Sequence, residues 1–213
     1  MLKMNISNKS FDDKIIFKNA NIVINDNDFL GIKGKSGSGK TTLLSMIGLL
    51  QGFDGNYFIC DNEVNKRNKD KFRKEYFSYV FQKSFLIPYY NVLENIIMPL
   101  KNAKEEVDKN RIFAMAKELE IDQILDCYPK TLSGGEAQRV AILRAYFSKR
   151  KYMLVDEPTG SLDPENSKKV MDLFKKLNTE YGITIIMVTH SNDFDSYFNR
   201  ILHIDNMEIK EYD

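Results

Sequence analysis

Short apolar runs and segments of helical periodicity alternate along the chain, which is the pattern of an α/β domain. The apolar runs predict buried strands, and the later ones are of the kind found in parallel sheets. The predicted strands are 28–32, 56–60, 152–155 and 183–188, with a closing hairpin at 200–204 and 207–212.

Apolar spacing and capping residues predict the helices between these strands. They span 40–50, 91–97, 104–120 and 164–181, and a further helix follows residue 132. Asn91 and Glu94 have the spacing of a capping pair, and Pro99 is expected to end the short helix that they open. The basic stretch 66–74 is expected to form a solvated face.

Composition places these elements in one domain of ordinary globular character. The 213 residues carry 31 Lys and Arg against 30 Asp and Glu, a net charge of +1, which argues against a broadly basic nucleic-acid binder. No apolar run approaches the ~18–20 residues that cross a bilayer, and no secretory signal is visible. Cys60 and Cys127 form no CxxC motif, and two reduced thiols suit the cytosol. The protein is therefore expected to stay inside the cell.

A glycine-rich loop joins the predicted strand at 28–32 to the helix at 40–50. It matches the phosphate-binding pattern G-x-x-x-x-G-K-[ST]. Its residues are Gly34, Lys35, Ser36, Gly37, Ser38, Gly39, Lys40 and Thr41, followed by Thr42. Small residues let successive backbone N–H groups face phosphate oxygens at the positive end of a helix. Lys40 would reach the β- and γ-phosphates and the Thr41 hydroxyl would ligate Mg²⁺, so the loop predicts nucleotide binding.

Two acids follow the apolar run at 152–155. Asp156 is placed to hold the Mg²⁺ shell, and Glu157 is placed to polarise an attacking water as a general base. Acids are common at strand ends, so this pair gains its significance from the phosphate loop in the same chain.

A second glycine-rich helix start lies at 132–138. Ser133 and Glu136 have capping-box spacing, which an ordinary N-cap explains. An ordinary cap does not explain Gly134 and Gly135, because consecutive glycines weaken a helix. The sequence therefore offers two helix starts where N–H groups would face phosphate, but only one loop that carries a lysine.

Together these motifs resemble the ATP-binding-cassette (ABC) ATPase subunits over nearly the whole chain. The shared elements, in the family's order, are the phosphate loop, Gln82, Leu-Ser-Gly-Gly-Glu at 132–136, Asp156-Glu157, Ser161-Leu162-Asp163 and His190. The Leu-Ser-Gly-Gly-Glu element is the most specific, because other phosphate-loop ATPases and kinases lack it.

The resemblance implies an ATP hydrolase with an α/β, RecA-like phosphate-loop core, an N-terminal antiparallel β subdomain and an inserted α-helical subdomain. Residues 1–213 would form a single ABC ATPase domain. The core with its β subdomain is expected at 1–84 and 150–213, and the helical subdomain, which contains the signature element, at about 85–149.

The resemblance also implies a dimer. Ser133 and Gly135, with Gly134 between them, would bind the γ-phosphate of ATP held by a second subunit, in a head-to-tail arrangement that ATP brings together. Asp163 would help to join the two subunits, although its local place at a helix start also fits a cap.

Three further residues receive roles from the resemblance. Gln82 would touch Mg²⁺ and the attacking water, and His190 would contact the γ-phosphate. A lone surface Gln or a His at a strand end is more often structural. The roles of Gln82 and His190 therefore rest on their positions in the order of the family's motifs. Phe11 lies 23 residues before Gly34, where the family usually places an aromatic to stack on adenine. Selection of ATP over GTP is not specified by that stacking.

Two segments, 156–163 and 91–100, resemble the MacB/LolD type of ABC ATPase. Such subunits power a separate transmembrane permease subunit that moves peptides, lipoproteins or drugs, often out of the membrane or the cell. The implied protein is peripheral, at the cytoplasmic face of the membrane, with ATP and Mg²⁺ as ligands and no nucleic-acid partner. The aromatic segment 85–90 either receives a cytoplasmic helix of that partner or belongs to the helical core.

Three other functions remain open at this point. The cell-division ATPase of the same subgroup resembles the chain about as well. A non-transport ABC ATPase acting on nucleic acid or ribosomes would normally show a long coiled-coil insertion or a tandem cassette. A small-molecule kinase would share the phosphate loop but has no use for Leu-Ser-Gly-Gly-Glu. Cargo, direction of transport and the choice between homodimer and heterodimer are not specified by these motifs.

Overall fold

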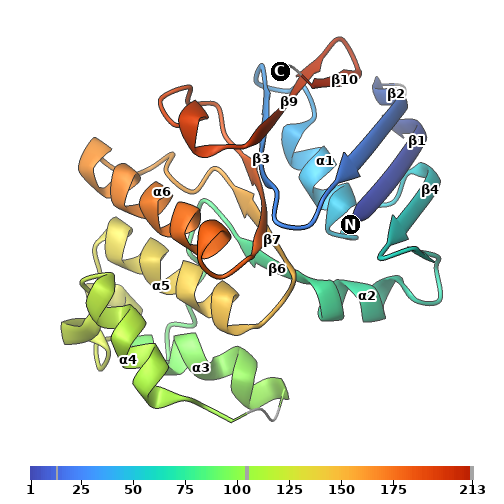
Figure 1. Cartoon of the computed structure of the whole chain (residues 1–213). Coiled ribbons are helices and arrows are strands. Elements are labelled where there is room, and N and C mark those ends of the chain that lie inside the picture. The colour runs from blue at the N-terminus through green and yellow to red at the C-terminus, as the bar shows by residue number, and fades with distance from the viewer. Residues whose placement is uncertain (13, 104–105, 212–213) are drawn as a thin grey trace.

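The structure, a computed structural model, describes residues 1–12, 14–103 and 106–211. Its strands are β1 (Leu2–Phe11), β2 (Lys14–Ile24), β3 (Phe29–Gly34), β4 (Asp54–Ile59), β5 (Asn62–Glu63), β6 (Phe77–Val80), β7 (Tyr152–Asp156), β8 (Thr184–Val188), β9 (Arg200–Asp205) and β10 (Glu208–Glu211). Within these residues one sheet has the order β2-β1-β4-β5 and the other β10-β9-β3-β8-β7-β6 (Figure 1).

The larger sheet is parallel except at one edge. β6, β7, β8, β3 and β9 run in the same direction, and β10 closes the sheet as an antiparallel hairpin with β9. Asp156 pairs with Val188, and Val188 in turn pairs with Ile32. The carboxyl ends of β3, β7 and β8 therefore meet at one edge, which is where open α/β sheets bind ligands.

Side-chain alternation along the central strands divides the core into two layers. In β7, Tyr152 and Leu154 pack toward α1 and the antiparallel sheet, whereas Met153 and Val155 pack toward the helical layer on the other face. β8 alternates in the same way, because successive side chains of a strand point to opposite faces. Figure 1 shows α1 between the two sheets and α3 to α6 on the opposite side of the larger one.

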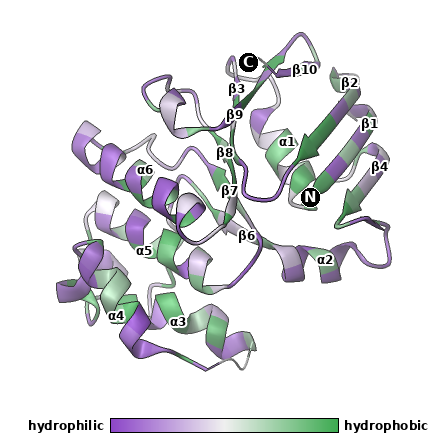
Figure 2. Ribbon diagram, viewed as in Figure 1, coloured by the Kyte–Doolittle hydropathy of each residue, from purple (hydrophilic) through white to green (hydrophobic). Residues whose placement is uncertain are grey.

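The helices are α1 (Lys40–Ile47), α2 (Lys69–Tyr76), α3 (Val92–Ala103), α4 (Lys109–Glu118), α5 (Gly134–Phe147) and α6 (Pro164–Thr179). Figure 2 shows hydrophobic residues along the strands and α1, while α2, which contains much of the basic stretch, is mostly hydrophilic. No helix in the described ranges has both the length and the apolar character needed to span a membrane.

The expected α/β fold is confirmed, including the antiparallel sheet of the N-terminal strands, but several element boundaries differ. Pro99 does not end its helix: α3 continues to Ala103 and buries Ile96 and Leu100. Packing of that apolar face outweighs the ~3 kcal/mol that a proline costs inside a helix.

Two other helices are shorter than expected. α1 ends at Ile47 because the chain turns at Gly48, where an added Cβ would lie 2.4 Å from the Tyr79 hydroxyl. α4 begins after Asp108, whose side chain accepts from the Arg111 N–H, so the expected start at 104 was wrong for the described part. Residues 104–105 of that expected helix, and residue 212 of the expected hairpin, lie outside the described residues.

Candidate nucleotide site

The phosphate loop lies between β3 and α1 and contains three glycines with positive φ. Gly34, Gly37 and Gly39 have φ of 153°, 75° and 103°, a region that L side chains rarely adopt. Gly39 is the N-cap of α1 and offers no side-chain hydrogen bond to the first turn. Lys40 Nζ lies across the loop and donates to the carbonyl oxygens of Gly34 (2.9 Å) and Lys35 (3.1 Å). The loop is therefore a set of uncapped N–H groups with an ammonium beside them.

One hydroxyl of this loop is left without a partner. Ser38 Oγ is buried, and no hydrogen bond joins it to any described residue. A Cβ added at Gly34 would lie 2.6 Å from that oxygen, so the loop leaves no space for a larger residue. Orphaned buried polar atoms are rare in folded proteins. Together with the uncapped start of α1, this hydroxyl fits a loop that binds phosphate oxygens.

Asp156, at the end of β7, faces the first turn of α1. Thr41 Oγ1 donates to Asp156 Oδ1 at 3.4 Å, so the two predicted Mg²⁺ ligands lie together. Burial, and then the neighbouring charge of Glu157, raise the pKa of the Asp156 carboxyl. A half-buried carboxylate with a raised pKa gains from a divalent cation, and hydroxyl and carboxylate oxygens are the ligands that Mg²⁺ prefers.

Glu157 and His190 form a second pair at the same edge. His190 Nδ1 lies 2.6 Å from Glu157 Oε2, which joins the end of β7 to the end of β8. Glu157 has φ of 47°, and its N–H donates to the carbonyl oxygen of Val188 at 3.0 Å. A glutamate in the left-handed region is strained, and such strain concentrates at functional sites.

Gln82 follows β6, the strand next to β7. Its side-chain nitrogen lies 2.9 Å from the place where a Cβ of Gly160 would stand. The Gly160 N–H donates to the carbonyl oxygen of Glu157, so Gln82 lies beside the turn that carries the acid. The structure thus places Gln82 next to the predicted catalytic residues.

The segment after Gln82 is held by side chains that the sequence analysis did not identify. Gln138 Nε2 donates to the Phe81 carbonyl (3.1 Å), and Arg144 donates to the carbonyls of Ser84 and Phe85. Asn95 of α3 is fully buried, accepts from the N–H of Ile87 and donates to the carbonyls of Ile87, Tyr90 and Asn91. Asn95 lies on the apolar face of a predicted helix, and a polar residue at such a position could have indicated a buried hydrogen-bonding role.

Phe11 lies at the end of β1 and is 45% exposed. Its ring lies under the Lys9 ammonium at 4.4 Å, and nothing else fixes it in place among the contacts of the described residues. Ile16 and Phe17 of β2 contact the loop directly, since a Cβ at Gly39 would lie 2.6 Å and 2.9 Å from them. These two residues were not among the predicted site residues. The start of β2 therefore packs against the phosphate loop.

The start of α5 makes its own hydrogen bonds, apart from this edge of the sheet. Ser133 Oγ accepts from the Glu136 N–H, while Glu136 Oε2 accepts from the Ser133 N–H, which is the expected capping box. Gly135 packs so closely on α6 that a Cβ would lie 2.5 Å from Asn166 Oδ1, and Asp163 caps α6. No hydrogen bond within residues 1–12, 14–103 and 106–211 joins 133–135 to the phosphate loop.

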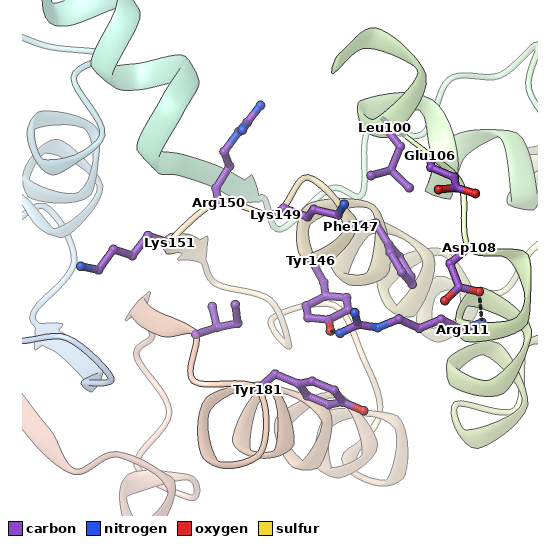
Figure 3. A pocket seen from close by; sticks show the side chains of 11 residues that line it. Leu100, Glu106, Asp108, Arg111, Tyr146, Phe147, Lys149, Arg150, Lys151 and Tyr181 are labelled. Atoms are coloured by element: carbon purple, nitrogen blue, oxygen red, sulfur yellow. Dashed lines mark hydrogen bonds between the residues drawn. The ribbon is translucent and has the colours of Figure 1, made fainter. Parts of the chain in front are cut away.

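A further pocket, of about 620 Å³, contains none of the predicted site residues (Figure 3). Arg111 crosses it beside the rings of Tyr146 and Tyr181. Its other wall includes Lys151 and Ile183, which precede β7 and β8. The pocket therefore lies at the amino ends of the strands whose carboxyl ends carry Asp156, Glu157 and His190.

Comparison with known proteins agrees with this geometry. The family model described as "ABC transporter" matches residues 17–160. The lipoprotein-releasing system ATP-binding protein LolD of Leptospira interrogans is 37% identical over 92% of this chain and 85% of its own length. The methionine import ATP-binding protein MetN of Francisella tularensis is also 37% identical, but the chain spans only 58% of its length.

Solved structures give the same result for the fold. The ABC transporter cassette MJ0796, a protein of Methanocaldococcus jannaschii, has a dimeric structure that covers 100% of this chain and 98% of its own, with a TM-score of 0.84 and 32% identity. A second dimeric structure of that cassette, in a post-hydrolysis state bound to ADP and Pi, has a TM-score of 0.82. This chain belongs to the ABC transporter family and is its nucleotide-binding, ATP-hydrolysing subunit.

Proposed function

We propose that this subunit powers export or extrusion of a peptide, lipoprotein or drug-like cargo through a separate transmembrane subunit. One observation supports the proposal: Asp156, Glu157 and His190 lie at one edge of the sheet, and within the described residues no hydrogen bond joins the signature helix start at 133–135 to that edge. A second copy would then supply the signature helix start that completes the site. The segments 91–100 and 156–163, which resemble the LolD type, favour export over import; the overall identity does not separate the two, since it is 37% to both LolD and MetN.

ATP would bind with its phosphates in the loop at 34–41. The N–H groups at the start of α1 and Lys40 would hold the β- and γ-phosphates, with Phe11 against the base. Thr41 and Asp156, with Gln82 beside them, are the residues that would hold Mg²⁺. When bound, Mg²⁺ would neutralise charge on the β- and γ-phosphates.

Hydrolysis would begin with a water held by Glu157. Its carboxylate accepts a proton as the water oxygen bonds to the γ-phosphorus, and the bond from that phosphorus to the bridging oxygen breaks to release ADP. His190 would contact the γ-phosphate, and its contact with Glu157 aligns the two groups. Glu157 has a positive φ of 47°, and backbone strain of this kind is stored at functional sites.

Ser133 to Gly135 would bind the γ-phosphate on the other subunit of a head-to-tail dimer. Ser133 and Gly134 are exposed, so both are available to a second chain. A homodimer supplies two competent sites, because every motif is present in one chain. Closure on two ATP and reopening after hydrolysis would be the motion that drives the membrane partner.

The surface after Gln82 is the proposed docking site for that partner, at the cytoplasmic face of the membrane. Phe85 and Tyr89 are 64% and 87% exposed, and Phe81 and Tyr90 are also exposed. Exposed aromatic clusters of this kind mark interaction surfaces. Their loop is joined to Gln82 at one end and to α3 at the other, so a helix docked there would sense the nucleotide site.

The Glu157→Gln variant tests the function. Loss of a general base costs ~10²–10⁴ in rate. We expect the variant to bind ATP, to turn over at that reduced rate and to accumulate as a closed dimer in gel filtration with ATP. Turnover at the wild-type rate would exclude Glu157 as the base.

The same variant identifies the partner. Tagged Glu157→Gln captured with ATP from membranes in mild detergent is expected to carry one transmembrane subunit. Lys40→Met, which is expected to bind ATP much more weakly, is the matched control. Co-purification of ribosomes or nucleic acid, or of a cell-division membrane protein, would replace transport with one of those functions.

A further inference from the structure

β3 carries, one residue before its end, a buried lysine that the nucleotide chemistry does not use. Phe29, Leu30 and Ile32 are apolar and fully buried, as a central parallel strand requires. Lys33 follows them and is only 4% exposed. A buried ammonium is costly unless it is paired and hydrogen-bonded, so its surroundings are informative.

The Lys33 ammonium lies among three oxygen acceptors, all from the segment that follows β8. Nζ donates to the carbonyl oxygen of Ser191 (2.9 Å) and to Asn192 Oδ1 (3.0 Å), and it forms an ion pair with Asp195. An ammonium has three N–H donors, so this set satisfies all of them. Residues 191–195, called here the switch segment, are therefore folded around the end of the lysine.

This contact lies next to both halves of the nucleotide site. Gly34, the first residue of the phosphate loop, follows Lys33, and His190 precedes Ser191. On the other side of His190, the Thr189 N–H donates to the Ile32 carbonyl at 3.3 Å. His190 is thus flanked on both sides by contacts to β3, one made by the backbone and one made by Lys33.

His190 itself is exposed over 68% of its side chain and touches the rest of the site only through Glu157 among the hydrogen bonds and ion pairs of the described residues. Its ring position therefore depends on where its backbone is held. Inside the switch segment, Ser191 Oγ donates to Asp193 and the Ser191 N–H donates to Thr189 Oγ1. The segment is a compact unit, and Lys33 fastens it to the sheet.

We propose that Lys33 is a positioning residue for hydrolysis, which holds the switch segment so that His190 faces the γ-phosphate. This inference rests on the role proposed above for His190. Because Lys33 acts through His190, its removal lowers turnover and leaves ATP binding by the phosphate loop unchanged.

The Lys33→Met variant keeps the apolar stem and removes the ammonium. We expect kcat to fall about tenfold with KM for ATP within about twofold, since a misplacement of ~1 Å costs up to ~10²-fold in rate. Lys3→Met is the matched control, because Lys3 pairs with Asp61 at 3.5 Å on the surface, and it is expected to leave both constants unchanged.

A double-mutant cycle separates positioning from general stability. In a His190→Ala background, Lys33→Met is expected to cause no further loss of the residual turnover, measured with radiolabelled ATP. An equal tenfold loss in that background, or wild-type kcat in the single variant, overturns the proposal. Wild-type turnover of His190→Ala alone would instead reject the role of His190, which is a separate outcome.

Two further variants keep the test valid if Lys33→Met folds poorly. Asn192→Ala removes one exposed acceptor and is expected to lower kcat by a smaller factor with KM unchanged. Asp195→Asn leaves the buried ammonium without its counter-charge, so it is expected to lower the Tm more than Lys33→Met does. An Asp195→Asn protein with wild-type Tm and kcat would also contradict the proposal.

Discussion

Helices α1 and α5 both begin at glycine-rich segments, but their first turns are satisfied differently. α1 starts at Gly39 in a left-handed conformation with no side-chain cap. α5 starts at Ser133 with a complete capping box to Glu136. Uncapped N–H groups favour an anion, whereas capped ones already have an acceptor. We therefore expect α1 to bind phosphate by itself, and α5 to exchange part of its cap for a phosphate held by a second chain.

The largest expected effect comes from the α1 end. Lys40→Met removes the ammonium that lies over the loop carbonyls, and we expect ATP affinity to fall by at least ~10²-fold. The ammonium would donate to two phosphate groups, and a hydrogen bond to a charged group is worth ~1.5–3 kcal/mol. Equilibrium binding of a fluorescent ATP analogue measures this. If affinity stays within about twofold, the loop does not dominate phosphate binding and the comparison fails.

Ser133→Ala, at the α5 end, is expected to have a smaller and different effect. Monomer affinity for ATP stays at the wild-type value, turnover falls ~10²-fold as for a lost donor in a charge-stabilising site, and the helix loses ~1 kcal/mol of capping. A steady-state ATPase assay measures the fall in turnover, and thermal melts measure the loss of stability. Weaker ATP binding by the monomer would show that α5 acts within its own chain.

Mixing the two variants sharpens this result. A head-to-tail dimer of a Lys40→Met chain with a Ser133→Ala chain would have one intact site. That site combines the phosphate loop of the Ser133→Ala chain with the signature of the Lys40→Met chain. Turnover of the mixture is therefore expected to exceed that of either variant alone. No recovery would favour a site completed within one chain.

The smallest effects concern two carboxylates, Glu136 in the first turn of α5 and Asp156, which faces the first turn of α1. The hydroxyl and backbone N–H of Ser133 lower the pKa of Glu136, so this group adds stability above its ordinary value of 4.5, and that stability is lost as the pH falls through its folded pKa. Burial and Glu157 raise the pKa of Asp156, so its ionisation destabilises the fold as the pH rises past the ordinary 3.8.

Glu136→Gln and Asp156→Asn should therefore shift the Tm in opposite directions at pH 7 without ligands. The first is expected to lower stability by ~0.3–1 kcal/mol, as for a charge at a helix start, and the second to raise it. The Asp156→Asn difference should shrink as the pH falls below 3.8, and the Glu136→Gln difference should shrink as the pH falls through the lowered folded pKa of Glu136. If the two variants shift the Tm at pH 7 in the same direction, the contrast between the two carboxylates is wrong.

The sequence predicted the motif-bearing parts of the site better than the parts that hold them. Helix caps at Asp163 and Ser133 are local, and both were confirmed. Pro99 was misread because its helix is stabilised by packing on distant residues, which local rules do not include. Lys33 and Arg144 were missed for the same reason, because each bonds a segment far from its own position in the chain. Asn95 was missed although its partners lie just before its helix. Roles of the nucleotide-contacting residues stay predictions.

Asn95 has a mechanical consequence. The exposed aromatic loop at 85–90 is tied to α3 by Asn95 and to α5 by Arg144. Because of these hydrogen bonds, a tilt of α3 and α5 would move this loop together with the two helices. The displacement of the loop would then depend on its distance from the axis of the tilt. Gly134 and Gly135, at the start of α5, would take part in the same rotation.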